Sequence, residues 1–308
     1  MHLTPEQANN KKLIRYLAEQ AIPEAIHSIY PLPAGITSHN FEINHHIIFK
    51  LPGLTTPVSS WIQQSQCAPI LQKYLSCRIP QPALSPVFLN STAHDFLLSS
   101  SHEKIEGKTI SHSSDFFKKD ISFKTHFFEQ LSNFTHQIHS IPSEALPVRI
   151  PTAEEFLKNL FLRSVGGITP FQEKNLHKII HSSVFGFNEK LSSSTLCHCD
   201  LRPANICLDK RDNIVGILDF DSLNRGEPFF EFRPMLYGSE NHEADTKLFY
   251  HIYCHKTGYK THPNNLKKMR RLFWSLCIFS AICKVDKAQG IKEKICFFKG
   301  MKNIFKSL

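Results

Sequence analysis

The segment 198–205, His-Cys-Asp-Leu-Arg-Pro-Ala-Asn, holds the densest group of polar residues that could do chemistry. Asp200 and Asn205 stand at the two ends of a short predicted loop. A predicted hairpin over residues 206–218 would return the chain so that Asp219 lies beside this loop. Three oxygen-bearing side chains would then converge on one spot. Such ligands suit Mg²⁺, which proteins usually hold through one or two side chains together with phosphate groups and water.

This set of side chains suits phosphoryl transfer, a reaction in which the protein mainly positions the reactants and neutralises charge. Asn205 and Asp219 can supply oxygen ligands to a magnesium ion. Asp200 is then left to orient an attacking hydroxyl and to accept its proton. Arg202 lies in the same loop. It could neutralise the transferred phosphoryl group, or it could only cap the loop through a salt bridge.

The pattern His-x-Asp-x-x-x-x-Asn, followed by Asp-Phe and a further acid, resembles the aminoglycoside phosphotransferase/choline kinase family, which has the protein-kinase-like fold. Other motifs follow in the order of that family and extend the resemblance over most of the chain. They lie at Gly35–Phe41, Ile47–Pro52, Ile79–Pro82, Phe96–Leu98, Ile105–Lys108, Leu131–Ile141 and Gly226–Glu231. The resemblance implies an α+β, bilobal fold, with a small β-rich N-lobe at residues 1–100 and a larger, mainly helical C-lobe at residues 101–308.

The same resemblance implies ATP and Mg²⁺ as cofactors, bound between the lobes, and a role for each matching residue. Lys50 would contact the α- and β-phosphates, Ser38 the β-phosphate, and the backbone near Ser100 would face adenine. The implied set is Asp200 as the catalytic base, Asn205 and Asp219 as metal ligands, and Lys50, Ser38, Ser100 and Arg202 as cofactor-binding residues.

The resemblance implies a small-molecule hydroxyl as the phosphoryl acceptor, on an aminoglycoside, amino alcohol, sugar or homoserine-like compound, and no nucleic acid partner. Acidic residues between Glu227 and Asp245 mildly favour an amine-bearing acceptor. One departure from the family pattern concerns the helix that should offer Lys50 an acidic partner, since it contains no Glu. Gln66 is the nearest substitute by spacing. This departure motivates an alternative, a kinase-like nucleotide-binding module or pseudokinase with little transfer activity, and a protein kinase is a further alternative.

Other polar residues near these motifs are more typical of structure than of catalysis. We expect His198 to hydrogen-bond the backbone of the loop, His139 to pack in the core, and Glu231 to anchor a helix or loop. Cys197 and Cys199 invite a metal interpretation. Alternate residues of an extended segment point to opposite faces, however, so the two thiols should diverge.

The periodicity of apolar residues predicts the elements that position these groups. A capping box of Thr4 and Gln7 opens a first helix, and Thr152 with Glu155 opens another. Runs rich in β-branched and aromatic residues predict strands at 26–32, 41–43, 47–51, 87–89, 96–99, 206–208 and 214–218, with a tight turn at Asn44-His45-His46. Helical spacing predicts helices at 56–75 and 116–138, and the spacing of the Phe residues in the second indicates that they fill the core.

The composition bounds the class of protein. The chain has 308 residues, of which 41% are hydrophobic, so it can bury a core without disulfides and is not largely disordered. The longest apolar run, Leu272–Cys283, is too short to cross a membrane, and residues 1–20 do not resemble a signal peptide. An odd number of Cys, nine, favours a cytoplasmic location. The basic tail Lys284–Lys306 is typical of a surface helix, with a membrane-surface or nucleic-acid contact as the alternative. The sequence does not indicate the oligomeric state.

Overall fold

The computed structural model describes residues 3–32, 38–53, 58–89, 96–110, 113–165, 169–170, 172–176, 195–228, 231–232 and 240–259. The chain divides into two compact units. The first unit comprises Met1–Lys108, Ala145–Val148 and Ile206–Asp221, and the second unit comprises Thr109–Glu144, Arg149–Asn205 and Ser222–Leu308. The division after Lys108 differs from the predicted boundary near residue 100, and the segment 206–221 groups with the first unit although we expected it in the C-lobe.

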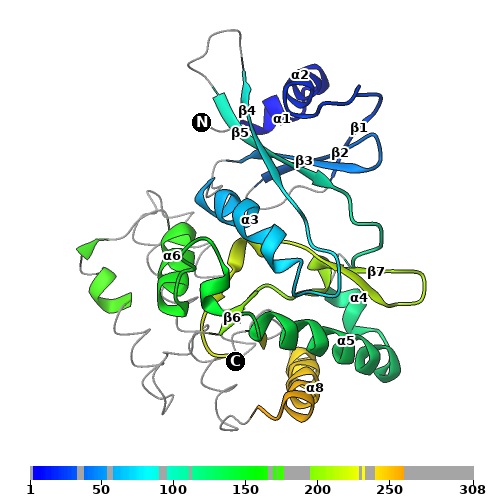
Figure 1. Ribbon diagram of the computed structural model, residues 1–308, viewed down its shortest axis with the longest axis vertical. Coiled ribbons are helices and arrows are strands. Elements are labelled where there is room, and N and C mark those ends of the chain that lie inside the picture. Colours follow the sequence, from blue (N-terminus) through cyan, green and yellow to red (C-terminus); the bar gives the residue numbers. More distant parts are fainter. Residues whose placement is uncertain are drawn as a thin grey trace, which may run out of the picture. The chain divides into compact units, whose positions relative to one another are not determined.

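The first unit contains a five-stranded sheet in the order β1-β2-β3-β5-β4, and every neighbouring pair is antiparallel (Figure 1). Its strands are β1 (Ile29–Pro31), β2 (Ser38–Ile43), β3 (Ile47–Pro52), β4 (Ala83–Phe88) and β5 (Phe96–Glu103). The predicted tight turn between β2 and β3 is confirmed, and its residues Asn44 and His45 have positive φ angles of 49° and 65°. This turn fixes the register of the hairpin.

One face of the sheet packs against α2 (Lys11–Ala21) and forms the core of the first unit. Phe41, Phe49 and Leu97 from the sheet meet Ile14 and Leu17 of the helix in one buried apolar cluster. The predicted first helix is in fact two helices, α1 (Pro5–Ala8) and α2. The Thr4–Gln7 capping box opens α1 as predicted, but the Asn10 side chain accepts from Lys12 N and Leu13 N and so begins a second helix.

The hairpin of β7 (Ile206–Leu208) and β8 (Ile214–Ile217) belongs to the first unit because backbone hydrogen bonds tie both of its strands there. Lys108 and Leu208 exchange two bonds of 2.9 Å, and Arg78 bonds to Val215 and Ile217 at 3.1 and 3.0 Å. Gly216 permits this close approach. A Cβ atom at Gly216 would lie 2.6 Å from Cγ2 of Ile105.

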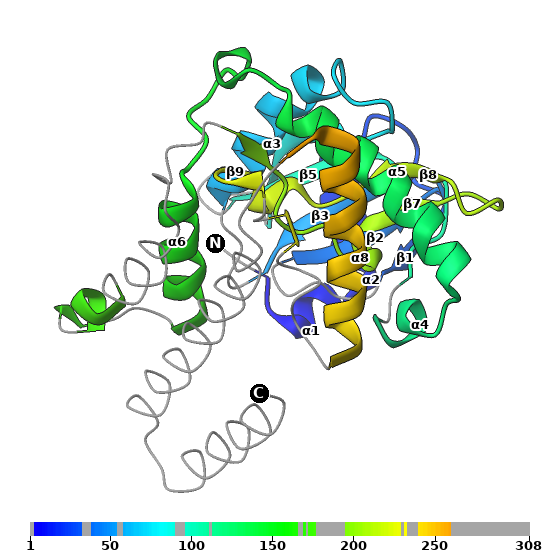
Figure 2. The ribbon, with the colours of Figure 1, turned by 90° about the horizontal axis from the view of Figure 1, so that it is seen from below.

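The second unit is mainly helical. It contains α4 (Ser113–Phe117), α5 (Ile121–His139), α6 (Ala153–Val165) and α8 (Glu240–Thr257), with the short 3₁₀ turns η2 (Pro203–Asn205) and η1 (Ser143–Ala145) nearby in sequence. Helices α5 and α8 lie side by side (Figure 2). The predicted helix 116–138 is interrupted, because Asp120 accepts a hydrogen bond from Phe123 N at 2.8 Å and caps the start of α5. A short strand pair, β6 (Leu196–Cys197) with β9 (Asn224–Arg225), completes the described part of this unit.

An aromatic cluster holds α5 to α8 within the second unit. Phe128 of α5 stacks on Phe249 of α8 with ring centroids 5.3 Å apart, and Phe232 contacts Phe249 at 4.7 Å. All three rings are buried. The Phe abundance of α5 therefore fills the core, as the helical spacing predicted.

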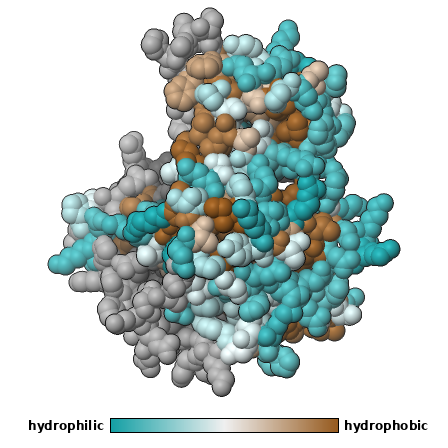
Figure 3. Space-filling model, in the orientation of Figure 1, coloured by the Kyte–Doolittle hydropathy of each residue, from teal (hydrophilic) through white to brown (hydrophobic). Residues whose placement is uncertain are grey.

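The described surface is mostly hydrophilic on the face shown in Figure 3, with smaller apolar areas between. The large exposed apolar side chains belong to several different elements and are Tyr16, Tyr30, Ile62, Tyr74, Phe96 and Ile121. Among the described helices, none is both long enough and apolar enough to cross a membrane. Residues 35–37 of the predicted nucleotide loop, the run Leu272–Cys283 and the basic tail Lys284–Lys306 lie outside the described residues.

Candidate active site

The predicted catalytic loop, residues 198–205 and called the catalytic loop below, is closed by hydrogen bonds among the residues that the sequence singled out. The side-chain amide of Asn205 donates to Oδ2 of Asp200 at 2.8 Å and to its carbonyl oxygen at 2.9 Å. Nε of Arg202 lies 3.3 Å from the same Oδ2, which is the salt bridge that we gave as the alternative role for Arg202. The structure therefore brings Asp200, Arg202 and Asn205 together, as predicted.

Asn205 of the second unit and Asp219 of the first unit each carry a donor atom of the kind that magnesium prefers. Because Nδ2 of the buried Asn205 is committed to Asp200, its Oδ1 is the atom left without a hydrogen bond among the described residues. Asp219 follows β8 with a left-handed backbone, φ 61°, and its carboxylate forms no hydrogen bond or ion pair within the described part of the chain. An amide oxygen and a carboxylate are the hard ligands that Mg²⁺ prefers.

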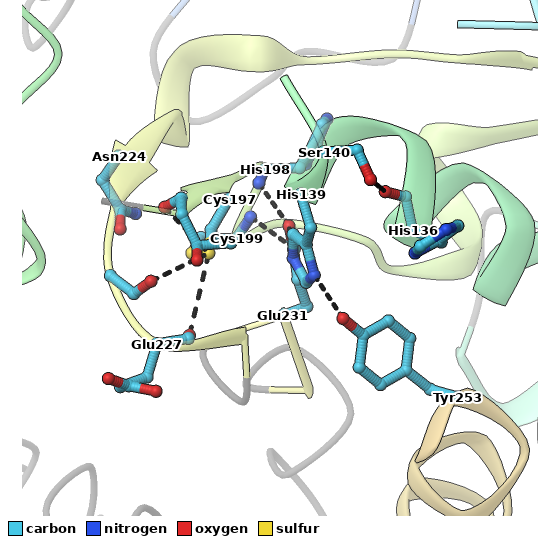
Figure 4. A network of polar contacts seen from close by, with 12 residues as sticks. His136, His139, Ser140, Cys197, His198, Cys199, Asn224, Glu227, Glu231 and Tyr253 are labelled. Carbon is cyan, nitrogen blue, oxygen red and sulfur yellow. Dashed lines mark hydrogen bonds and ion pairs between the residues drawn. The ribbon is translucent and has the colours of Figure 1, made fainter. Parts of the chain in front are cut away.

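A buried carboxylate, Glu231, holds the start of the catalytic loop (Figure 4). Its two oxygens accept hydrogen bonds from the backbone N–H groups of His198 and Cys199. Burial would raise the pKa of Glu231, but His139, whose Nε2 lies 3.4 Å from Oε1, together with His198 and the N–H of Cys199, lowers it overall. The prediction that Glu231 anchors a loop is confirmed.

The two histidines near the loop have structural positions, as expected. His198 is buried, and its Nδ1 accepts a hydrogen bond from Asp200 N at 3.2 Å, which shapes the loop. His139, at the end of α5, lies in the core with its Nδ1 2.6 Å from the hydroxyl of Tyr253. The sequence did not single out Tyr253, because nothing in the pattern of α8 distinguishes it from the other aromatic residues of this helix.

The expectation that the thiols of Cys197 and Cys199 diverge is wrong. Cys199 has a left-handed backbone, φ 63°, so the alternation of an extended strand does not reach it. The two thiols lie close enough to share a hydrogen bond. The prediction assumed a strand conformation through residue 199, whereas β6 ends at Cys197.

Three possible metal ligands, from His139, Cys197 and Glu231, lie within 4.8 Å of one another. The surroundings of the sulfur do not suit a metal-bound thiolate. Sγ of Cys197 faces the backbone carbonyl oxygens of Thr195, Gly226 and Glu227 at 3.7 to 3.8 Å, and burial raises the pKa of the thiol well above its usual value. A neutral thiol fits this environment. His139, Cys197 and Glu231 are therefore better described as hydrogen-bonded core residues than as metal ligands.

In the first unit, the predicted phosphate-binding residues share one face of the sheet. Lys50 of β3 pairs with Asn40 of β2 on one side and with Ser100 of β5 on the other. Ser38 lies two residues before Asn40, on the same face, and its hydroxyl donates to Asn40 Oδ1 at 2.8 Å. Asn40 was missed by the sequence analysis, although the predicted turn fixes it opposite Lys50.

The ammonium of Lys50 has no acidic partner within the described residues. Its neighbour on the same face is His102, which pairs with Ile48. Burial, helped by the positive charge of Lys50, lowers the pKa of His102 to about 4, so this imidazole is neutral near pH 7. Lys50 thus faces a neutral residue where the family pattern led us to look for a carboxylate.

Gln66, the predicted substitute for the missing Glu, is exposed on α3 (Val58–Leu71). The buried face of this helix includes Trp61 and Gln64, and Nε2 of Gln64 has no hydrogen-bond partner in the described part of the chain. Gln64 is therefore the buried amide of this helix. No hydrogen bond joins Gln66 to Lys50 among the described residues, and spacing from Lys50 alone does not reveal how the helix is rotated about its axis.

Ser100 does not offer its backbone to a ligand. It lies in the middle of β5, paired with Lys50 on one side and Leu84 on the other, so its N–H and C=O point toward neighbouring strands. An adenine contact from the backbone of this stretch would therefore have to come from a neighbour such as His102, which pairs with β3 and has no partner in β4, and it stays a prediction. Its side chain is buried on the same face as Lys50.

A comparison with protein-family models identifies the family of this chain. A family model, described as the phosphotransferase enzyme family (APH), matches residues 97–270, more than half of the chain. No curated protein matches the sequence.

Solved structures of phosphotransferases have the same fold. A GDP complex of a mutant aminoglycoside 2'-phosphotransferase IIIa superposes with a TM-score of 0.72 at 16% identity and covers 97% of each chain. The GDP and kanamycin complex of APH(2'')-IIIa gives 0.69 at 15% identity, covering 96% of this chain and 98% of that one. The macrolide 2'-phosphotransferase MphH from Brachybacterium faecium gives 0.59 at 13%, covering 91% and 96%.

These likenesses confirm the predicted protein-kinase-like fold. The family match confirms the predicted class of enzyme and includes Asp200, Arg202, Asn205 and Asp219 in its range. The chain belongs to the phosphotransferase enzyme family.

Proposed function

We propose that this protein transfers the γ-phosphoryl group of ATP, with Mg²⁺, to a hydroxyl group of a small molecule, and that Asp200 is the catalytic base. The observation that carries the proposal is the closed loop in which Asn205 and Arg202 both contact Oδ2 of Asp200, in a chain of the phosphotransferase family. A carboxylate held in one orientation is what a general base requires, because it must meet the proton of the acceptor hydroxyl at hydrogen-bond distance.

In this proposal each unit contributes separate groups. Asn205, through Oδ1, and Asp219, through its carboxylate, would hold Mg²⁺, which when bound neutralises phosphate charge. Lys50, whose ammonium forms no ion pair with any described residue, would bind phosphate oxygens. The hydroxyl oxygen of Ser38 is able to accept a hydrogen bond as it stands. Because its hydrogen is donated to Asn40, it could donate to a phosphate oxygen only after that hydrogen bond breaks.

Arg202 has two possible uses in the reaction. Its Nε is engaged with Asp200, while about half of the side chain is exposed. The remaining guanidinium N–H groups can therefore contact the transferred phosphoryl group while the salt bridge persists. We assign it this double role.

The acceptor is proposed only by class. The similar solved structures are phosphotransferases of aminoglycosides and of macrolides, two unlike kinds of hydroxyl-bearing compound. The acidic stretch from Glu227 to Asp245 adds little support for an amine-bearing acceptor. Glu231 is buried against the loop amides, and Asp245 pairs with Lys124 at 3.1 Å.

The test is an ATP-consumption assay with Mg²⁺ against a panel of aminoglycosides, macrolides, amino alcohols and sugars. Turnover of at least one acceptor is expected, and Asp200→Ala should abolish it while the protein stays folded. Asp115→Ala, which removes an exposed carboxylate of α4, is the matched control. Equal activity of Asp200→Ala and the wild type would refute the assignment of the base.

A second candidate function is nucleotide binding without transfer. The neutral surroundings of Lys50 favour it, since no carboxylate of the described residues holds this side chain in place. Thermal-shift measurements with ATP and Mg²⁺ separate the two functions. Binding without turnover on the whole panel would support the binding module.

A further inference from the structure

We propose that Tyr253 and Tyr259, at and just beyond the C-terminal end of α8, are positioning residues that fix the catalytic loop. They do not contact Asp200 themselves. Each is the outer end of a chain of contacts that finishes on residues 197–199, immediately before Asp200. All of these residues lie in the second unit.

The first chain of contacts runs through His139 (Figure 4). The hydroxyl of Tyr253 lies 2.6 Å from Nδ1 of His139, and Nε2 on the other side of the ring lies 3.4 Å from Oε1 of Glu231. Glu231 in turn accepts the backbone N–H groups of His198 and Cys199. Helix α8 is thereby connected, through α5, to the two amides that start the catalytic loop.

The Tyr253 hydroxyl is the decisive contact in this chain because, among the described residues, it is the short hydrogen-bond partner of His139, at 2.6 Å from Nδ1. Nε2 of His139 is buried and makes no hydrogen bond among the described residues, facing Glu231 only as an ion pair. Without the hydroxyl, the imidazole would be free to turn. Glu231 is fully buried, and a buried carboxylate that loses its partner is costly, so its hold on the loop amides would weaken.

The second chain of contacts runs through Glu227. The hydroxyl of Tyr259 donates to Oε2 of Glu227 at 3.2 Å, and the backbone oxygen of Glu227 faces Sγ of Cys197 at 3.7 Å. The rings of Tyr253 and Tyr259 also contact each other, with centroids 5.9 Å apart. Both chains of contacts therefore begin at one place and end on neighbouring residues of the loop.

The consequence is that the last turn of α8 sets the position of Asp200 although it contains none of the reacting groups. A displaced base lowers the rate of transfer, whereas the affinity for ATP does not depend on it. Loss of either tyrosine hydroxyl should therefore reduce kcat and leave the KM for ATP unchanged. A purely structural role would lower the melting temperature without this split.

The test compares Tyr253→Phe and Tyr259→Phe with Tyr250→Phe in the full chain. Tyr250 lies on the same helix, and its hydroxyl interacts with Cys254 and, in the part of the chain that the structure describes, with no member of either chain of contacts, so it is the matched control. Hydrogen exchange, followed by mass spectrometry on peptides covering 195–205, reads the loop directly. Loss of one buried hydrogen bond should speed exchange there by about tenfold in Tyr253→Phe and leave the peptides of α2 unchanged.

The kinetic part of the test uses whichever acceptor the panel identifies and rests on the proposed function. We expect kcat to fall by about tenfold in Tyr253→Phe, with the KM for ATP changed less than about twofold. If the wild type turns over no acceptor, the proposed function fails, and hydrogen exchange alone still decides this inference. Loop exchange in Tyr253→Phe equal to that in Tyr250→Phe would overturn it.

Discussion

Asn205 holds Asp200 twice, through one side-chain nitrogen that donates to the carboxylate at 2.8 Å and to the main-chain carbonyl at 2.9 Å. This pair of bonds fixes both the side chain and the backbone of the proposed base. It also decides which atom of the amide remains for a metal ion, since Nδ2 is occupied while Oδ1 has no hydrogen bond from the described residues. One residue thereby links the two halves of the proposed chemistry.

Replacing Asn205 by Ala should therefore damage catalysis more than stability. The variant loses the orientation of Asp200 and one proposed metal ligand, and we expect kcat to fall by about 100-fold or more. Asn213→Ala is the matched control, because its amide also holds an aspartate, Asp209, but in the turn between β7 and β8. Steady-state kinetics with the acceptor from the panel measures both. A kcat within twofold of the wild type in Asn205→Ala would contradict the assigned role.

At Cys199 we expect Gly to be less destabilising than Ala, which is the reverse of the usual order for a buried side chain. The φ of 63° at Cys199 costs any residue with a Cβ about 1 kcal/mol, and Gly does not pay this cost. Cys199→Gly should therefore be more stable than Cys199→Ala by about 1 kcal/mol, although Gly removes more of the buried side chain. Urea denaturation followed by circular dichroism measures the difference.

The control for this inversion is Cys197, which is buried in β6 without a positive φ. There Gly should be less stable than Ala, because it adds backbone entropy to the unfolded chain and packs no side chain. The same order at both positions would show that the left-handed backbone of Cys199 does not control its energetics.

Gln64 should be replaceable with a gain in stability. Its buried Nε2 has no hydrogen-bond partner among the described residues, and such a group costs about 1 to 3 kcal/mol of desolvation. Gln64→Met has a similar volume and no polar hydrogen, so we expect it to raise the free energy of unfolding by about 1 kcal/mol. The exposed Gln66→Met on the same helix should change it by less than about 0.5 kcal/mol. A destabilised Gln64→Met would mean that the amide has a partner.

Acid should destabilise the first unit through His102. Burial lowers the pKa of His102 to about 4 from an ordinary 6.5, so between these values the unfolded chain binds a proton that the folded chain does not. Stability contributed by the neutral imidazole is complete above pH 6.5 and is lost as the pH falls toward 4, by about 3 kcal/mol at most.

The difference between variants isolates this effect from other titrating groups. In His102→Leu, the dependence of the free energy of unfolding on pH between 4 and 6.5 should become flatter than in the wild type. His136→Gln, which replaces an exposed histidine of α5, should leave that dependence unchanged. Identical slopes in His102→Leu and the wild type would show that His102 is protonated in the folded protein.

Features that depend on neighbouring residues were predictable from the sequence. The capping boxes Thr4–Gln7 and Thr152–Glu155 form as predicted, because both bonds of each box span only three residues. The turn at Asn44 and His45 and the contact of Asp200 with Asn205 are local in the same way.

Features that depend on tertiary packing were not predictable. Gln64 of α3 is buried and Gln66 is exposed. Which of the two is buried depends on the rotation of the helix about its axis, with Trp61 on the buried face. The contact between Cys197 and Cys199 depends on a backbone angle that Glu231 helps to hold from a distant part of the sequence. The pairing of Ser100 on both sides depends on strand order, which no single segment contains.

The way the chain is shared between the two units has a consequence for synthesis. The first unit begins at the N-terminus but includes Ile206–Asp221, so it is not a continuous segment. On the ribosome, the sheet of β1 to β5 emerges long before the hairpin that bonds to Arg78 and Lys108. The N-terminal part of the first unit therefore lacks its last two strands until residues 206–221 have been translated. Closing so long a loop also slows folding. A nascent chain ending at Lys108 should be a client of chaperones, not a finished domain.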